Sequence, residues 1–195
     1  MVRRASGTIM LRHGFEIDYL FQIQSGRVKL GVADAAGSER ASTMRGPGSI
    51  LGLEALLGLP AQLDARVDVE GEFAMAEPAS FERWLAGGKV PLIAIVKHIV
   101  AENVRLTTER LLLEGNAESR TARFLLARET NPLLSAWREV ARHEVAGLLS
   151  MRPETLSRAI RLLQDRRAIG PGLELLDADE LRRIANDEEN GGNSK

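Results

Sequence analysis

The spacing of hydrophobic residues changes once along this chain, near residue 90, and that change separates a strand-like part from a helical part. From residue 9 to about residue 75, apolar and polar residues tend to alternate, as they do in strands with one buried face. In residues 19–32, two alternating runs flank Ser25-Gly26 and predict two half-buried strands joined by a tight turn. Because these short strands follow one another without a long helix between them, we expect an antiparallel barrel or sandwich.

Turn residues divide the strand-like part further. Residues 35–39 (Ala-Ala-Gly-Ser-Glu) and 45–49 (Arg-Gly-Pro-Gly-Ser) predict two more turns. Residues 50–59, rich in Gly and Leu and followed by Pro60, predict one or two helical turns inserted among the strands.

After Val90 the apolar residues recur every three or four positions, which predicts an amphipathic helix of about 25 residues that ends at Gly115-Asn116. Pro91 suits its first turn. A helix this long with one apolar stripe favours pairing with a second copy of the chain, and the alternative is packing on its own strand-like part. The residues of the predicted dimer seam are Ile93, Val96, Val100, Val104, Thr107 and Leu111.

The last third of the chain predicts a series of short helices. Asn116 is a suitable N-cap for a helix over residues 117–128, which residues 130–132 (Thr-Asn-Pro) interrupt. Residues 137–140 are a candidate strand, and helices are expected over 143–149 and 153–166 with a turn at 150–152. Two very short strands should flank Gly170-Pro-Gly, and Asp177 or Asp179 should cap a last helix that ends near residue 184. The tail, residues 186–195, is polar and is predicted to be disordered.

Two short helices followed by a small hairpin are typical of a winged helix-turn-helix. On the second helix, Glu154, Ser157, Arg158 and Arg161 share the face opposite the apolar residues. Arg can bind guanine, Glu can accept from cytosine and Ser can serve either strand, so this face suits the edges of base pairs in the major groove. The alternative is an ordinary solvated charged face.

Residues 143–169 resemble the DNA-binding domain of CRP/FNR-type bacterial transcription regulators, most specifically in Glu154-Thr155-Leu156-Ser157-Arg158. The resemblance covers roughly residues 7–185. It implies an α+β fold with an N-terminal antiparallel β-roll similar to cyclic-nucleotide-binding domains (1–89), a dimerisation helix (90–115) and a winged helix-turn-helix (116–185), followed by the tail.

The resemblance also implies roles for individual residues. Glu154, Ser157 and Arg158 match base-reading positions, Arg142 matches a phosphate contact, and Arg152 and Arg161 are further candidates for the DNA backbone. Pro153 stands where the CRP branch has Arg, so the helix is more similar to the FNR branch and implies TTGA-like half-sites. We therefore expect a homodimer on an inverted repeat in double-stranded DNA, an activator-type surface for RNA polymerase, and a cytoplasmic location.

Most of the residues that bind cyclic AMP in this family are replaced here. Gly52 is in place, but Leu53 stands where a ribose-binding Glu is expected, and Leu63 and Asp64 stand where a phosphate-binding Arg-Ser pair is expected. Arg105-Leu106 replaces the hydroxyl pair that reads adenine, although a local shift in alignment could bring Glu54 and Arg66 into the pocket. We expect a degenerate effector pocket and no binding of cyclic AMP in the usual way.

Composition narrows the remaining functions. The chain of 195 residues has no Cys, which excludes disulfides, thiol nucleophiles and the iron–sulfur sensor of the FNR branch. No metal site is predicted, and haem would have to use His13, His98, His143 or a Met. Net charge is −1 overall, but residues 117–185 hold 12 Arg against 10 acidic residues, or +2. No apolar run approaches the ~18 residues of a membrane span, and no enzyme motif is present.

These observations favour a DNA-binding regulator that needs no cofactor and is controlled by its own abundance. The main competitor is regulation by an unrecognised small molecule bound in the β-roll. A further alternative is a ligand-binding signalling module, for haem, a nucleotide or another small molecule, whose winged helix binds protein. Exposed apolar residues on the second helix would indicate that alternative.

Overall fold

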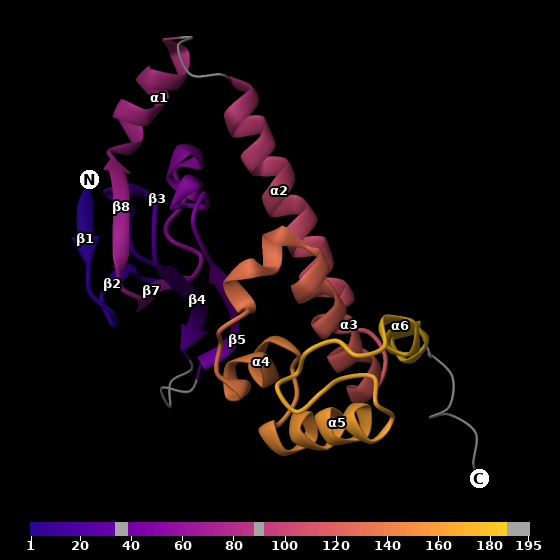
Figure 1. Cartoon of the computed structure of the whole chain (residues 1–195). Helices are drawn as coiled ribbons and strands as arrows, with labels where there is room; N and C mark the ends of the chain where they lie inside the picture. The colour runs from indigo at the N-terminus through magenta and orange to yellow at the C-terminus, as the bar shows by residue number, and fades with distance from the viewer. Residues whose placement is uncertain (34–38, 88–91, 187–195) are drawn as a thin grey trace. The chain divides into compact units, whose positions relative to one another are not determined.

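The strands lie in two four-stranded antiparallel sheets in the computed structural model, which describes residues 1–33, 39–87 and 92–186 (Figure 1). The first sheet contains, in spatial order, β1 (Val2–Arg4), β8 (Gly71–Ala76), β3 (Leu20–Ile23) and β6 (Ile50–Leu51). The second contains β2 (Ile9–Leu11), β7 (Asp64–Val69), β4 (Arg27–Ala33) and β5 (Glu39–Arg45). The strand-like pattern before residue 76 therefore predicted the fold of this part correctly.

The turn at Ser25-Gly26 carries the chain from one sheet to the other. Gly26 has a φ of +87°, and a Cβ there would lie 2.6 Å from the carbonyl oxygen of Val69. Gly71, at the start of β8, is equally crowded, because a Cβ there would overlap the carbonyl of Ser25. The predicted turn is confirmed, but β3 and β4 do not pair with each other. The backbone at Gly26 passes directly against the backbone at Gly71, and only residues without a side chain allow this close approach.

The core of the strand part draws side chains from both sheets. Phe21 and Ile23 on β3 and Phe73 on β8 are buried together with Val28 on β4 and Val67 on β7. The turn at residues 45–49 is present, with Gly48 at a φ of +91°. The helical insert is confirmed as a 3-10 helix, η1 (Leu53–Leu57), directly after β6. The turn expected at residues 35–39 falls largely outside the described residues.

Two helices follow the strands. No helix or strand is predicted over residues 76–89, but α1 (Pro78–Ala86) forms there, with Pro at its first position and Phe81 and Trp84 in ring contact 5.4 Å apart. Helix α2 (Leu92–Leu111) has 20 residues, somewhat fewer than the 25 expected. The chain divides into two compact units, Met1–Asn103 and Val104–Lys195, and the division falls within α2.

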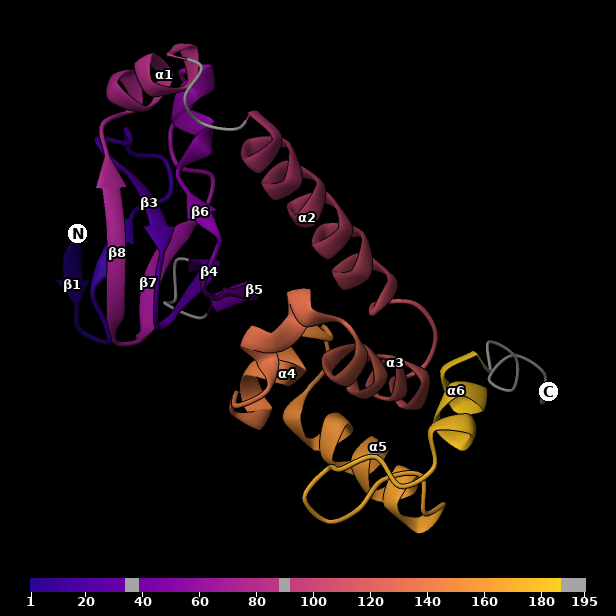
Figure 2. The same cartoon turned by 45° about the horizontal axis from the view of Figure 1, so that its top comes forward.

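The second unit is helical (Figure 2). It contains α3 (Ala117–Thr130), the 3-10 helix η2 (Pro132–Trp137), α4 (Arg142–Leu148), α5 (Pro153–Asp165) and α6 (Ala178–Asn186). Asn116 caps α3 as predicted, because its Oδ1 accepts a hydrogen bond of 2.9 Å from the amide of Ser119. Asp177 caps α6 by accepting from the amides of Asp179 and Glu180.

The prediction of a strand over residues 137–140 is wrong. Asn131 and Pro132 begin η2, which ends at Trp137, and the indole packs edge-on against Phe124 in the core with ring centroids 6.3 Å apart. The two very short strands after α5 are reduced to one antiparallel bridge between Ile169 and Leu175. Asn186, where the predicted tail starts, still belongs to α6, and residues 187–195 lie outside the described part.

Candidate functional site

Helices α4 and α5 are joined by a short, tightly bonded connection. Ser150 adopts a φ of +49°, and the amide of Met151 donates to the carbonyl of Ala146 over 2.9 Å. Pro153 begins α5, where its missing N–H costs nothing. The two helices turn their apolar faces inward and bury Val145, Ala146, Leu148, Leu149, Leu156, Ala159, Ile160 and Leu163. This packing fixes which side of α5 faces solvent.

The exposed side of α5 carries the residues predicted to read bases. Glu154, Ser157 and Arg158 are all exposed, as is Arg161 one turn further on. Within the described part of the chain, none of these four side chains makes a hydrogen bond or an ion pair, so their polar groups are available to a partner. The spacing of one or two helical turns therefore places an acceptor, a hydroxyl and two guanidiniums on one open face.

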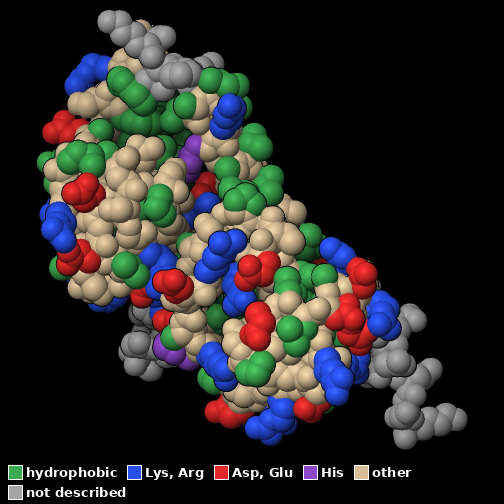
Figure 3. All heavy atoms as spheres, viewed as in Figure 1, with side chains coloured by type: hydrophobic (Ala, Val, Ile, Leu, Met, Phe, Trp, Pro, Cys, Tyr) green, Lys and Arg blue, Asp and Glu red, His purple; other side chains and the backbone are tan. Residues whose placement is uncertain are grey.

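Two further arginines expected to touch the DNA backbone lie at the starts of the two helices. Arg142 is the first residue of α4 and Arg152 is the N-cap of α5, and both are exposed. Acidic side chains lie among the basic ones on the visible face of this unit, so the charge is mixed rather than a continuous basic patch (Figure 3). His143 is also exposed, with its Nε2 3.3 Å from a carboxylate oxygen of Glu144.

Helix α2 leaves the predicted dimer seam uncovered. Ile93, Val96, Val100, Val104 and Leu111 are each 45–57% exposed, and Thr107 is exposed as well. The half-buried side of the first part of the helix holds Ile95, His98, Ala101 and Glu102 instead. A row of large apolar side chains this long in contact with water is unusual on a surface that binds nothing.

The expected effector pocket is a small cavity of about 160 Å³. Gly52, Leu53 and Leu63 line it as expected, and Gly52 needs to be glycine because its φ is +85° and a Cβ would lie 3.1 Å from Ile17. Asp64 does not line the cavity, since its carboxylate accepts a 2.8 Å hydrogen bond from the amide of His13. The imidazole of His13 lies 2.9 Å from the carbonyl of Gln62.

Arg105 also lies elsewhere. It belongs to the second unit, where its buried side chain donates to the carbonyl of Leu133 over 3.0 Å. Of the two residues that a shifted alignment would bring in, Glu54 lines the cavity, whereas Arg66 reaches the carbonyl of Gly7.

Two further charged residues line the cavity, Arg45 and Glu102, and neither was predicted from the sequence. Arg45 is only 5% exposed, and its Nε donates to Oε2 of Glu102 over 3.0 Å. Its Nη1 donates to the hydroxyl of Thr43 over 2.7 Å and to the carbonyl of Met44 over 3.0 Å. The guanidinium of Arg45 is therefore already bound by other groups of the chain. No local sequence pattern indicates this contact, because Arg45 and Glu102 are 57 residues apart.

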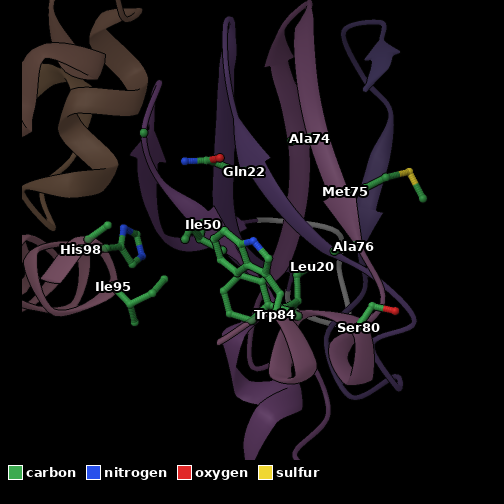
Figure 4. A pocket seen from close by; sticks show the side chains of 13 residues that line it. Leu20, Gln22, Ile50, Ala74, Met75, Ala76, Ser80, Trp84, Ile95 and His98 are labelled. Atoms are coloured by element: carbon green, nitrogen blue, oxygen red, sulfur yellow. The ribbon is translucent and has the colours of Figure 1, made fainter. Parts of the chain in front are cut away.

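A second and larger cavity of about 490 Å³ lies beside the first sheet, against α1 and the first part of α2 (Figure 4). Among the residues that line this cavity, the sequence predicted a ligand-binding role only for His98, as a candidate haem ligand. Among the described residues there is no group of three or more His, Asp or Glu side chains that could hold a metal ion. None of the described helices is long and apolar enough to cross a bilayer.

Comparison with known proteins agrees with this architecture. Residues 1–87 match the model of the cyclic nucleotide-binding domain. No curated protein sequence matches the chain.

Several solved structures resemble it over nearly their whole length. One is a CRP-family transcriptional regulator from Thermus thermophilus, with 24% identity over 95% of this chain and 96% of that chain and a TM-score of 0.69. A second is FixK2 from Bradyrhizobium japonicum, with 21% identity, coverage of 94% and 98%, and a TM-score of 0.74. A third, also from Thermus thermophilus, is a CRP/FNR-family regulator with 21% identity, coverage of 96% and 99%, and a TM-score of 0.62. Residues 1–87 are thus similar to cyclic nucleotide-binding domains, and the chain has the mixed α+β fold seen in these CRP/FNR-family transcription regulators.

Proposed function

We propose that this chain is a sequence-specific DNA-binding transcription regulator that acts as a homodimer and does not use cyclic AMP. The observation that carries the proposal is the open face of α5, where Glu154, Ser157 and Arg158 stand exposed opposite a fully buried apolar face. In the proposed domain organisation, residues 1–89 form the sensor-like domain, residues 90–115 form the dimerisation helix, and residues 116–185 form a winged helix-turn-helix.

Helix α5 suits the major groove because its polar groups match base edges. The guanidinium of Arg158 can bond O6 and N7 of one guanine, the carboxylate of Glu154 can accept from N4 of cytosine, and Ser157 can bond either kind of edge. All three side chains start from the first two turns of α5, the part of a recognition helix that approaches the bases. The bridge between Ile169 and Leu175 would form the base of the wing.

Arg142, Arg152 and Arg161 would contact phosphates. Their exposed guanidiniums add charge that does not depend on sequence, and so contribute affinity and orientation rather than specificity. The visible face of this unit mixes acidic and basic side chains (Figure 3), so we assign sequence specificity to the α5 contacts and not to a continuous basic patch.

The exposed apolar stripe of α2 supports a homodimer. Pairing two copies through Val96, Val100 and Val104 would remove these side chains from water along much of the helix. A two-fold dimer binds an inverted repeat whose half-sites lie about one helical turn of DNA apart. Similarity of the α5 sequence to the FNR branch suggests TTGA-like half-sites.

Independence from cyclic AMP is supported by the contents of the small cavity. At about 160 Å³ it is well below the roughly 300–1,000 Å³ of typical small-molecule sites. Leu53 and Leu63 offer no polar group to a ribose or phosphate, and Glu102 already accepts from the guanidinium of Arg45. A cyclic nucleotide would have to displace that ion pair and widen the cavity.

Binding to protein through α5 is the alternative function. On this helix Leu162 is the one large apolar side chain with substantial exposure, at 42%, within the part of the chain that the structure describes. The predicted reading face is polar instead, and polar groups suit nucleic acid better than a protein groove.

A mobility-shift titration tests the proposal. Purified protein is titrated onto a duplex with an inverted repeat of TTGA half-sites and onto a scrambled duplex, at several salt concentrations. We expect preference for the repeat and a steep loss of affinity with salt. The triple variant Glu154→Ala/Ser157→Ala/Arg158→Ala should lose the preference, whereas Arg3→Ala, an exposed arginine in the other unit, should retain it. Equal binding of both duplexes by the wild-type protein would contradict the proposal.

A further inference from the structure

The 490 Å³ cavity lies on the side of the first sheet that faces away from the strand core (Figure 4). Side chains alternate across β3 and β8, so that Phe21, Ile23 and Phe73 enter the core while Gln22, Ala74 and Ala76 line the cavity. Trp84 on α1 and Ile95 and His98 on α2 form the opposite wall. We call this space the apolar pocket, and it lies wholly within the first compact unit.

The apolar pocket exists because small residues meet there. Ala74 and Ala76 on β8 and Ala94 on α2 stand where a sheet packed against helices ordinarily carries large branched side chains. A volume of 490 Å³ is many times that of a packing defect and falls within the range of small-molecule sites.

The chemistry of the walls restricts what could bind. Most lining groups are aliphatic or aromatic, and the side-chain polar groups are those of Gln22, Ser80, His98 and the indole N–H of Trp84. No charged side chain lines the pocket within the described part of the chain. An ionised ligand would lose its hydration without gaining a partner, which costs several kcal/mol, so the pocket selects against charge.

Aromatic rings dominate the α1 wall. Phe81 and Trp84 are in contact at 5.4 Å, and Trp84 remains 49% exposed although it is one of the largest apolar side chains of the chain. A flat aromatic ligand could cover the indole in an offset arrangement, which favours aromatic over purely aliphatic ligands. The amide of Gln22 and the imidazole of His98 could each form a hydrogen bond that orients the ligand.

From this geometry we propose that the apolar pocket is a binding site for an uncharged, largely aromatic small molecule with one or two hydrogen-bonding groups. The site is separate from the 160 Å³ cavity, which contains the Arg45–Glu102 ion pair and shares only Ile50 and His98 with the pocket. Because Ala94, Ile95 and His98 belong to α2, a bound ligand would touch the sheet and this helix at once.

The test uses the full-length chain and N-phenyl-1-naphthylamine, an uncharged aromatic amine whose fluorescence rises in apolar surroundings. We expect saturable binding with one probe per chain. The double variant Ala74→Leu/Ala76→Leu fills the pocket and should weaken binding by at least about tenfold, which is about 1.4 kcal/mol. Ala86→Leu, at an exposed position of α1 that does not line the pocket, is the matched control and should bind like the wild type.

Two further measurements keep the test decisive if the filled variant folds poorly. Trp84→Ala removes a side chain that is 49% exposed, so the variant should still fold cooperatively in thermal unfolding, and it should weaken binding of the probe. The anionic analogue 1-anilinonaphthalene-8-sulfonate should bind at least about tenfold more weakly than the uncharged probe. Absence of saturable binding, full binding by Trp84→Ala, or equal affinity for the anion would overturn the proposal. None of these measurements involves DNA, so their failure would leave the proposed function standing.

Discussion

Arg45 at the end of β5 and Glu102 in α2 form an ion pair, with 3.0 Å between Nε and Oε2, inside the cavity where a nucleotide would be expected. The arginine side chain is 6% exposed and the glutamate side chain 24%. An internal carboxylate thus neutralises the one arginine that lines this cavity among the described residues, and it links the strand part to α2.

Glu102→Ala should destabilise the protein. The change leaves a buried guanidinium without its carboxylate partner, which costs about 3–5 kcal/mol in fully buried pairs and less where one partner meets water. We expect a loss of about 1–3 kcal/mol in the free energy of unfolding, measured by urea denaturation. Glu82→Ala, at an exposed position of α1, is the control and should change it by less than about 0.5 kcal/mol. Equal effects of the two changes would show that the ion pair contributes nothing.

Arg158→Ala should reduce both affinity and selectivity for DNA. Losing one bidentate contact to guanine costs about 1–3 kcal/mol of discrimination at one base pair. Binding to duplexes that carry each single substitution in the half-site measures this effect. The variant should tolerate replacement of one G·C pair that the wild type rejects. A uniform loss across all duplexes would mean that Arg158 contacts phosphate instead.

Arg142→Ala should behave in the opposite way. An exposed arginine at the start of α4 suits a phosphate, so its removal should weaken every duplex by a similar factor. The slope of log affinity against log salt should fall in magnitude by about one. Salt titrations on the repeat and the scrambled duplex provide the measurement, and a change of sequence preference without a change of slope would refute the assignment.

Val100→Glu should weaken the proposed dimer. Val100 is 56% exposed at the middle of the α2 stripe, and a carboxylate at a paired position would be buried without a partner. We expect at least a roughly tenfold rise in the dimer dissociation constant by analytical ultracentrifugation. Leu57→Glu, at a 77% exposed position of η1, serves as the control and should leave association unchanged. A wild-type protein that stays monomeric at all concentrations measured would contradict the assignment of α2 as the dimer interface.

Local patterns were enough to locate most elements. The cap at Asn116 and the start of α5 at Pro153 depend on residues within one turn of the helix and were predicted correctly, and Asp177 was one of the two candidates for the cap of α6. Alternation around Ser25-Gly26 identified two strands, but their pairing depends on the close approach of Gly26 to Val69 and of Gly71 to Ser25, which is a tertiary contact. Sequence alone could not assign β3 and β4 to different sheets.

The incorrect predictions also arise where tertiary contacts decide the structure. A strand was expected over residues 137–140, but Trp137 is the last residue of η2, where its indole packs against Phe124. Helix α1 was missed although Pro78 marks its start. In the small cavity, Gly52, Leu53 and Leu63 come from one short stretch of the sequence, whereas Arg45 and Glu102 come from distant segments and could not be brought together by a local pattern.

The most direct test of the account is a titration of purified protein, without added effector, onto a duplex with an inverted repeat of TTGA half-sites, repeated with millimolar cyclic AMP and at several salt concentrations. The account predicts tight binding of one dimer per duplex, the same affinity with and without cyclic AMP, and a steep decrease with salt. Binding that appears only with cyclic AMP would contradict independence from the nucleotide. Absence of any salt-dependent preference for the repeat would contradict the assignment of α5 as a DNA-reading helix.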